Sequence, residues 1–142
     1  MTNQRTIREK AVFKGIGLHT GILTTIAFIP APADSGVKFV RTDLPGRPRI
    51  PALIDHVIGV IRGTSLGVDE AQVHTVEHVC SALYALGIDN LTVELNGSEP
   101  PVADGSSKPF METLLGAGIL EQEKSKIFFI PKEPIVYKQN ET

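Results

Sequence analysis

Short runs of apolar and β-branched residues, separated by turn residues, fill the first 62 positions of the chain. Glycine and proline mark the turns, as in Gly15–Gly17, Pro30–Pro32 and Pro45–Pro48. Such spacing is typical of antiparallel sheets, because each turn returns the chain alongside the preceding run. We expect Pro51 at a strand start or a sheet edge, since proline has no N–H to donate. The predicted strands cover residues 5–13, 22–29, 37–41 and 49–61.

The apolar spacing changes in the second half of the chain. A three-to-four-residue period predicts an amphipathic helix over 73–86, ended by Gly87. Alternating residues predict a strand over 91–95, and a further helical pattern predicts a short helix over 107–117, closed by Gly118. Strands followed by helix, strand and helix indicate an α+β fold. We expect a two-layer sandwich, a mainly antiparallel sheet with two helices packed on one face.

The last stretch, 126–138, again has strand character, with apolar runs at 127–130 and 135–137. A strand pair here needs a partner, because its apolar face and its backbone edge both require covering. The sequence stops soon afterwards, at Thr142. We therefore expect a first domain over 1–123, and a linker with the opening strands of a second domain over 124–142, the rest of which this chain lacks.

Length and composition exclude several classes of protein. With 142 residues, 42% of them hydrophobic, the chain is long enough to bury a core without disulfides or a structural metal. Cys80 is the single cysteine, which fits a reducing, cytoplasmic setting. Apolar stretches such as 26–31 are far shorter than the roughly 20 residues of a membrane span. No apolar run follows the N-terminus to form a signal peptide, so we expect a soluble protein.

The charges are distributed unevenly along the chain, although the net charge is only −2. Residues 5–62 carry nine basic and four acidic side chains, whereas residues 63–123 carry one basic and ten acidic side chains. The low net charge argues against general nucleic-acid binding. The basic half could meet a phosphorylated ligand and the acidic half could bind cations, or both could be solvated faces of opposite sign.

The segment His74–His78 is the one cluster of metal-ligating residue types in the sequence. Its H-x-x-E-H pattern matches the inverted zincins, in which two histidines on one helical face hold zinc and the glutamate activates a water. Alternatively, Glu77 and His78 are ordinary helix residues, with His74 and Glu77 forming an exposed pair. On the predicted helix Glu77 and His78 flank the buried stripe, where a cleft could reach them.

Six short motifs occur in a fixed order: Gly15–Gly21, Pro30–Pro32, Arg41–Leu44, Thr75–His78, Ala85–Asn90 and Asp104–Ser106. In these motifs the chain resembles the LpxC family of zinc-dependent UDP-3-O-acyl-N-acetylglucosamine deacetylases. The resemblance covers nearly the whole chain, but only the first of the two domains of that family. It implies a cytoplasmic Gram-negative enzyme that removes the N-acetyl group from UDP-3-O-(3-hydroxyacyl)-N-acetylglucosamine in lipid A biosynthesis.

The resemblance also implies roles for individual residues. Glu77 corresponds to the general base, and His78 to a ligand of Zn²⁺. These roles suit the chemistry, since zinc lowers the pKa of a bound water and polarises the amide carbonyl, while a nearby carboxylate takes the proton. An open zinc site needs three protein ligands. In the family the other ligands, and the histidine that protonates the leaving amine, come from the second domain, which must then be supplied in cis or in trans.

Four further features have weaker assignments. His74 lies where the family varies, so we interpret it as incidental. His19, in a glycine-flanked turn, either lines the substrate cleft or stabilises the turn by a hydrogen bond. Thr64 belongs to a segment, 62–65, that approaches the metal site in the family, and is a second candidate for the cleft. Asp104–Ser106 matches a family motif and is also typical of a turn and helix cap.

Three hypotheses for the function follow. The first is the N-terminal half of the zinc deacetylase, which folds by itself but binds zinc weakly and is inactive alone. The second is a stand-alone, non-catalytic module that binds a nucleotide sugar or pairs with another chain. The third is an inverted-zincin metalloprotease, which would require zinc bound by both His74 and His78.

Overall fold

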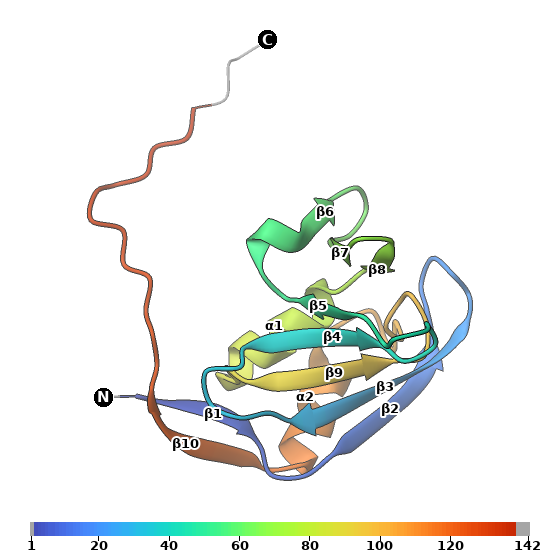
Figure 1. Ribbon diagram of the computed structural model, residues 1–142, viewed down its shortest axis with the longest axis horizontal. Coiled ribbons are helices and arrows are strands. Elements are labelled where there is room, and N and C mark those ends of the chain that lie inside the picture. Colours follow the sequence, from blue (N-terminus) through green and yellow to red (C-terminus); the bar gives the residue numbers. More distant parts are fainter. Residues whose placement is uncertain (1, 139–142) are drawn as a thin grey trace.

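The computed structural model describes residues 2–138, and a five-stranded mixed sheet forms its centre (Figure 1). Neighbouring strands are antiparallel, except that β4 runs parallel to β9. Pro51 ends the edge strand β5, as its missing N–H requires. In spatial order the strands are β2 (Ala11–Ile16), β3 (Leu23–Pro30), β9 (Leu91–Leu95), β4 (Val37–Arg41) and β5 (Arg49–Pro51).

Two helices, α1 (Glu77–Leu86) and α2 (Lys108–Gly116), lie behind this sheet in Figure 1. Their apolar faces join the inner face of the sheet in one core. Phe110 of α2 is fully buried and packs edge-to-face on Phe28 and Phe13, with ring centroids 6.3 and 5.5 Å away. The predicted α+β sandwich, with two helices on one face of the sheet, is confirmed. Within residues 2–138, neither helix has the length and apolar character needed to cross a membrane.

A small antiparallel sheet follows β5 and was not predicted. The expected long strand over 49–61 is wrong in its middle, where Pro51 ends β5 and a turn of 3₁₀-helix intervenes. Two residues with positive φ, Arg62 at 57° and Gly63 at 157°, then turn the chain back. The new elements are η1 (Ile54–His56), β6 (Val57–Gly59), β7 (Ser65–Val68) and β8 (Ala71–Val73).

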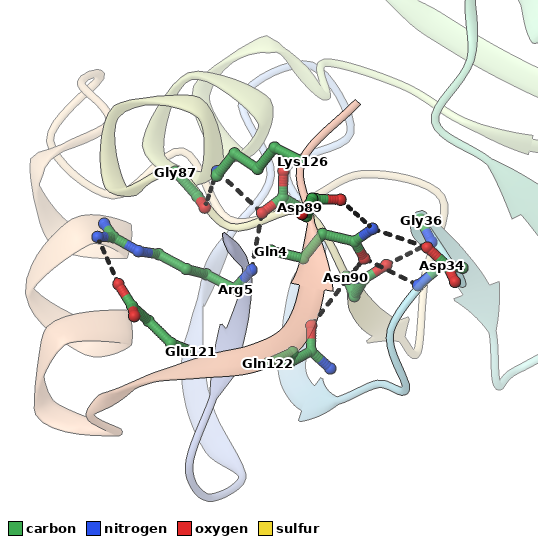
Figure 2. Close-up of polar contacts among 11 residues, drawn as sticks. Gln4, Arg5, Asp34, Gly36, Gly87, Asp89, Asn90, Glu121, Gln122 and Lys126 are labelled. Carbon is green, nitrogen blue, oxygen red and sulfur yellow. Dashed lines mark hydrogen bonds and ion pairs between the residues drawn. The ribbon is translucent and has the colours of Figure 1, made fainter. Parts of the chain in front are cut away.

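The chain is closed by an antiparallel pair between β1 (Asn3–Ile7) and β10 (Ile119–Ser125). Figure 2 shows the polar network that holds this pair to the body. The Asn90 side chain, only 2% exposed, donates to both Gln4 and Gln122, at 2.8 Å each. The motif that includes Asn90 therefore has a structural role, because a buried amide is stable only when its hydrogen bonds are made.

The strands predicted within 126–138 are wrong, because the structure has no strand in this segment. Instead, the last strand of the described residues is β10. Lys126 follows it and forms an ion pair with Asp89, with Nζ and Oδ2 2.9 Å apart. The chain then runs away from the sandwich (Figure 1), leaving Ile127 91% and Phe129 89% exposed. A strand requires a neighbour for its backbone groups, and the described residues place none beside this segment. The division into two domains stays a prediction.

Candidate functional site

Glu77 and His78 form the first turn of α1, and both are half-buried. The helix begins four residues later than predicted, because Val73 belongs to β8 and Thr75 has a left-handed φ of 55°. A carboxylate in the first turn is favoured by the partial positive charge of the helix N-terminus. The sequence therefore places a carboxylate and an imidazole at successive positions of a helix start.

Thr64 fixes the position of the Glu77 carboxylate. The backbone N–H of Thr64 donates to Glu77 Oε2 at 2.9 Å, and the Val76 N–H donates to the Thr64 carbonyl at 3.1 Å. Gly63 lies so close that a Cβ atom there would be 3.2 Å from Glu77 Oε1. This close approach explains a glycine at position 63, and it leaves Oε1 as the carboxylate oxygen that Thr64 does not occupy.

One hollow lies at this carboxylate, and a second lies on the other side of the segment 62–65. Glu77 and Thr64 line a mainly apolar groove of about 470 Å³ between η1, β6, β7 and α1. Gly63, His19 and Arg62 line a second, smaller hollow of about 230 Å³. Of the two candidate cleft residues, Thr64 therefore bonds to the Glu77 carboxylate directly through its backbone, while His19 lies at the second hollow.

His19 lies in a turn at the smaller hollow, and its place in a substrate cleft stays a prediction. Its side chain is exposed and lines the smaller hollow. The turn is held by its backbone N–H, not by its imidazole, through a hydrogen bond of 3.0 Å to Glu99 Oε2. The same carboxylate accepts the N–H of Thr20 at 2.9 Å. The glycine-flanked turn is thus built around a buried acid that the sequence analysis did not identify.

His74 precedes α1, so it does not share a helical face with His78. Its Nδ1 lies 2.9 Å from the Ser65 hydroxyl on β7. The prediction of a helix from residue 73 is therefore wrong for His74, and so is the exposed pair with Glu77, since these two side chains bond to Ser65 and Thr64 instead. The helical geometry that the inverted-zincin alternative requires is not formed.

The described residues supply only part of a metal site. Within residues 2–138, no three His, Cys, Asp or Glu side chains are grouped so that they could hold a metal ion. His78 offers one imidazole at the helix start, next to the Glu77 carboxylate. A catalytic zinc site uses three protein ligands and an open position. The donor set therefore fits one ligand of such a site, and the others would have to come from outside these residues.

Two ionisable groups near the site have shifted pKa values. Burial alone would raise the pKa of Glu99, but hydrogen bonds from the Thr20 and His19 N–H groups and from the Thr75 and Thr20 hydroxyls outweigh it and lower the pKa. Burial, with a smaller contribution from Glu77, raises the pKa of Cys80 to about 11. The Cys80 thiol is therefore neutral at neutral pH, which makes it a poor nucleophile.

The Asp104–Ser106 motif forms the turn that was predicted. The Ser106 N–H donates to Asp104 Oδ1 at 2.9 Å, and the Lys108 N–H donates to the Ser106 hydroxyl at 3.1 Å. These bonds satisfy free N–H groups at the start of α2. Asp104 is exposed, and hydrogen bonds from Ser106 lower its pKa. The motif therefore serves to start a helix.

Comparison with known proteins identifies the family of this chain. The model of the LpxC family, described as UDP-3-O-acyl N-acetylglycosamine deacetylase, matches residues 4–142, so the chain belongs to this family. It is 52% identical over 141 residues to a bifunctional enzyme LpxC/FabZ of Chlorobaculum tepidum, covering 99% of this chain and 30% of the relative.

Further relatives are similar over nearly the same region. A UDP-3-O-acyl-N-acetylglucosamine deacetylase of Bdellovibrio bacteriovorus is 46% identical over 138 residues, which cover 97% of this chain and 46% of the relative. A UDP-3-O-acyl-N-acetylglucosamine deacetylase of Myxococcus xanthus is 44% identical over 133 residues, which cover 94% of this chain and 42% of the relative. The chain thus spans less than half the length of each of these curated relatives.

Proposed function

We propose that this chain supplies one half of a zinc-dependent deacetylase that removes the N-acetyl group from UDP-3-O-acyl-N-acetylglucosamine in lipid A biosynthesis. The observation that carries the proposal is the successive pair Glu77 and His78 at the start of α1, with the Glu77 carboxylate held by the Thr64 N–H at the larger groove. Membership of the LpxC family, and the names of its relatives, support the substrate and the reaction.

In this proposal Glu77 is the general base. Its Oε2 accepts the Thr64 N–H, which fixes the carboxylate and leaves Oε1 to take a proton from the attacking water. His78 holds the metal ion through one imidazole nitrogen, and the adjacent positions of the two residues keep base and metal ligand within one helical turn. When bound, zinc would polarise the amide carbonyl and lower the pKa of water.

The remaining ligands would come from a second domain, in cis or in trans. The relatives are more than twice as long as the region that they share with this chain, which supports a further domain. Exposed apolar side chains after β10, such as Ile127 and Phe129, support contact with it. We expect the chain alone to bind zinc weakly, because a single histidine supplies one of the three ligands needed. We place the protein in the cytoplasm of a Gram-negative bacterium. The single cysteine, Cys80, supports the reducing compartment.

A hybrid protein tests this function. In it, this chain is followed by the part of the Bdellovibrio bacteriovorus relative that the shared region does not cover. We expect the hybrid to release acetate from UDP-3-O-acyl-N-acetylglucosamine. This acetate release should stop when a chelator removes zinc and recover when zinc is returned. The 142-residue chain alone is expected to release none. Acetate release that persists in the chelated hybrid, or that the chain alone achieves, would contradict the proposal.

A further inference from the structure

We infer that Glu99 is a positioning residue for the site: its buried carboxylate joins the Gly15–Gly21 turn to the segment that leads into α1, and so sets where Glu77 and His78 lie. This inference rests on the function proposed above for Glu77 and His78. Glu99 itself lies in the loop after β9 and touches neither of them, so its effect is transmitted through Thr75.

Glu99 is 1% exposed, and protein groups take the place of water around its carboxylate. Oε2 accepts the His19 N–H, the Thr20 N–H and the Thr20 hydroxyl, at 3.0, 2.9 and 2.9 Å. Oε1 accepts the Thr75 hydroxyl at 2.8 Å and also lies 3.1 Å from the His19 N, which it shares with Oε2. A buried charge is stable only when it is hydrogen-bonded in this way. The four donor groups belong to two segments more than 50 residues apart in the sequence, so the carboxylate links them.

The link ends on a strained residue directly before the site. Thr75 is buried and has a φ of 55°, a left-handed conformation that a β-branched residue rarely adopts. Such strain costs on the order of 1–3 kcal/mol and persists only when surrounding contacts hold it. The bond to Glu99 is one such contact. The others flank it: the His74 N–H donates to the Ser98 carbonyl at 2.8 Å, and the Val76 N–H donates to the Thr64 carbonyl.

The conformation of Thr75 determines the direction in which the chain enters α1. If Thr75 relaxed to an ordinary negative φ, the backbone at Val76 and Glu77 would turn away from Thr64. The hydrogen bond between the Thr64 N–H and the Glu77 carboxylate would then lengthen or break. Glu99 therefore acts on Glu77 indirectly. Its hydrogen bond holds Thr75, and the backbone from Thr75 to Glu77 transmits the effect.

The glycines of the His19 turn are explained by the same carboxylate. A Cβ atom at Gly17 would lie 2.5 Å from Glu99 Oε2 and 2.4 Å from the Thr20 hydroxyl oxygen. Real Cβ atoms do not approach so closely, so only glycine lets the turn close over Glu99. A Cβ at Gly15 would likewise meet the side chain of Pro101, at 2.9 Å. The Glu99 carboxylate thus joins the glycine motif to the Thr75–His78 motif.

An anion is needed at this position because the carboxylate is surrounded by donors. The two backbone N–H groups can only donate, and glutamine in place of Glu99 would present an NH₂ group to some of these donors. The hydrogen bond between the Thr75 hydroxyl and Glu99 can be removed with a smaller change to the buried site. Valine has the shape of threonine without its hydroxyl, and serine keeps the hydroxyl, so Thr75→Val and Thr75→Ser form a matched pair.

The first arm of the test is NMR on the 142-residue chain. In Thr75→Val we expect the amide resonances of Thr64 and Glu77 to shift and the Thr64 N–H to exchange faster with solvent, whereas Thr75→Ser stays near the wild type. Thr113→Val is the control, because the Thr113 hydroxyl also donates a hydrogen bond, in this case to the Pro109 carbonyl at 2.8 Å within α2. If Thr75→Val leaves Thr64 and Glu77 as they are in the wild type, the inference is overturned.

The second arm measures acetate release by the hybrid protein. Misplacing a catalytic group costs about 10- to 100-fold in rate, so we expect Thr75→Val to lower kcat by about that factor, with KM changed less than about twofold, and Thr75→Ser to recover most of the loss. An active hybrid in which Thr75→Val keeps the wild-type kcat overturns the inference. A wild-type hybrid without activity contradicts the proposed function instead, and the NMR arm then decides on the positioning role.

Discussion

Replacing Glu77 by glutamine in the hybrid protein is expected to lower kcat for acetate release by about 10²- to 10⁴-fold, the usual contribution of general base catalysis. Glutamine has nearly the size of glutamate and can still accept the Thr64 N–H through its amide oxygen. It cannot take a proton from water at neutral pH. The fold and the placement of His78 should therefore survive while the proton transfer is lost.

Steady-state kinetics and the zinc content of the same preparation check this expectation. The Glu77→Gln variant should retain the zinc of the parent, since Glu77 is the base and not a ligand in this account. Glu112→Gln is the matched control, because Glu112 is an exposed glutamate on α2 whose partner is Lys108, 3.8 Å away. A Glu77→Gln hybrid that keeps a kcat within tenfold of the parent would show that another group takes the proton.

Replacing Glu99 by glutamine is expected to destabilise the 142-residue chain by about 3 kcal/mol at neutral pH. Hydrogen bonds to charged groups contribute about 1.5–3 kcal/mol each, and buried donors left without an acceptor add a cost of about 1–3 kcal/mol each. Some of the bonds to this side chain survive in the variant, because one oxygen remains. The free energy of unfolding in urea measures the effect, with Glu112→Gln again as the control.

The stability difference should also depend on pH in a defined direction. Hydrogen bonds from Thr20, His19 and Thr75 hold the folded-state pKa of Glu99 below its ordinary value of 4.5, against the effect of burial. The unfolded chain therefore binds the proton first as the pH falls. The carboxylate stabilises the fold fully above 4.5, and this stabilisation is lost between 4.5 and the lower folded-state pKa. If the difference in unfolding free energy between wild type and Glu99→Gln stays constant over this pH range, Glu99 is not the ionised group that these hydrogen bonds stabilise.

The strongest periodic patterns in the sequence predicted their elements well. The strand at β9, the helix at α2 and most of α1 follow from apolar spacing, because each buries one continuous face in the core. The start of α1 could not be predicted. It depends on the left-handed Thr75, which is held by Glu99 from 24 residues further along the chain, and local propensity does not contain such a contact.

The C-terminal segment shows the opposite error. Apolar residues in 126–138 predicted strands that the structure lacks, whereas the polar segment Ile119–Ser125 forms β10. Strand formation there depends on a partner, β1, at the other end of the sequence. The site divides in the same way. Glu77 and His78 were found because they stand together in a motif, but Glu99 was missed because it resembles an ordinary charged loop residue before two prolines.

The zinc content of purified hybrid protein with His78 or His74 replaced by alanine tests the central claim most directly. The two histidines lie four positions apart, but only His78 is on α1, while His74 bonds to Ser65. We predict that His78→Ala loses most of the bound zinc and that His74→Ala keeps it. Zinc retained in His78→Ala, or lost equally from both variants, would contradict the assignment of His78 as the single ligand from this chain.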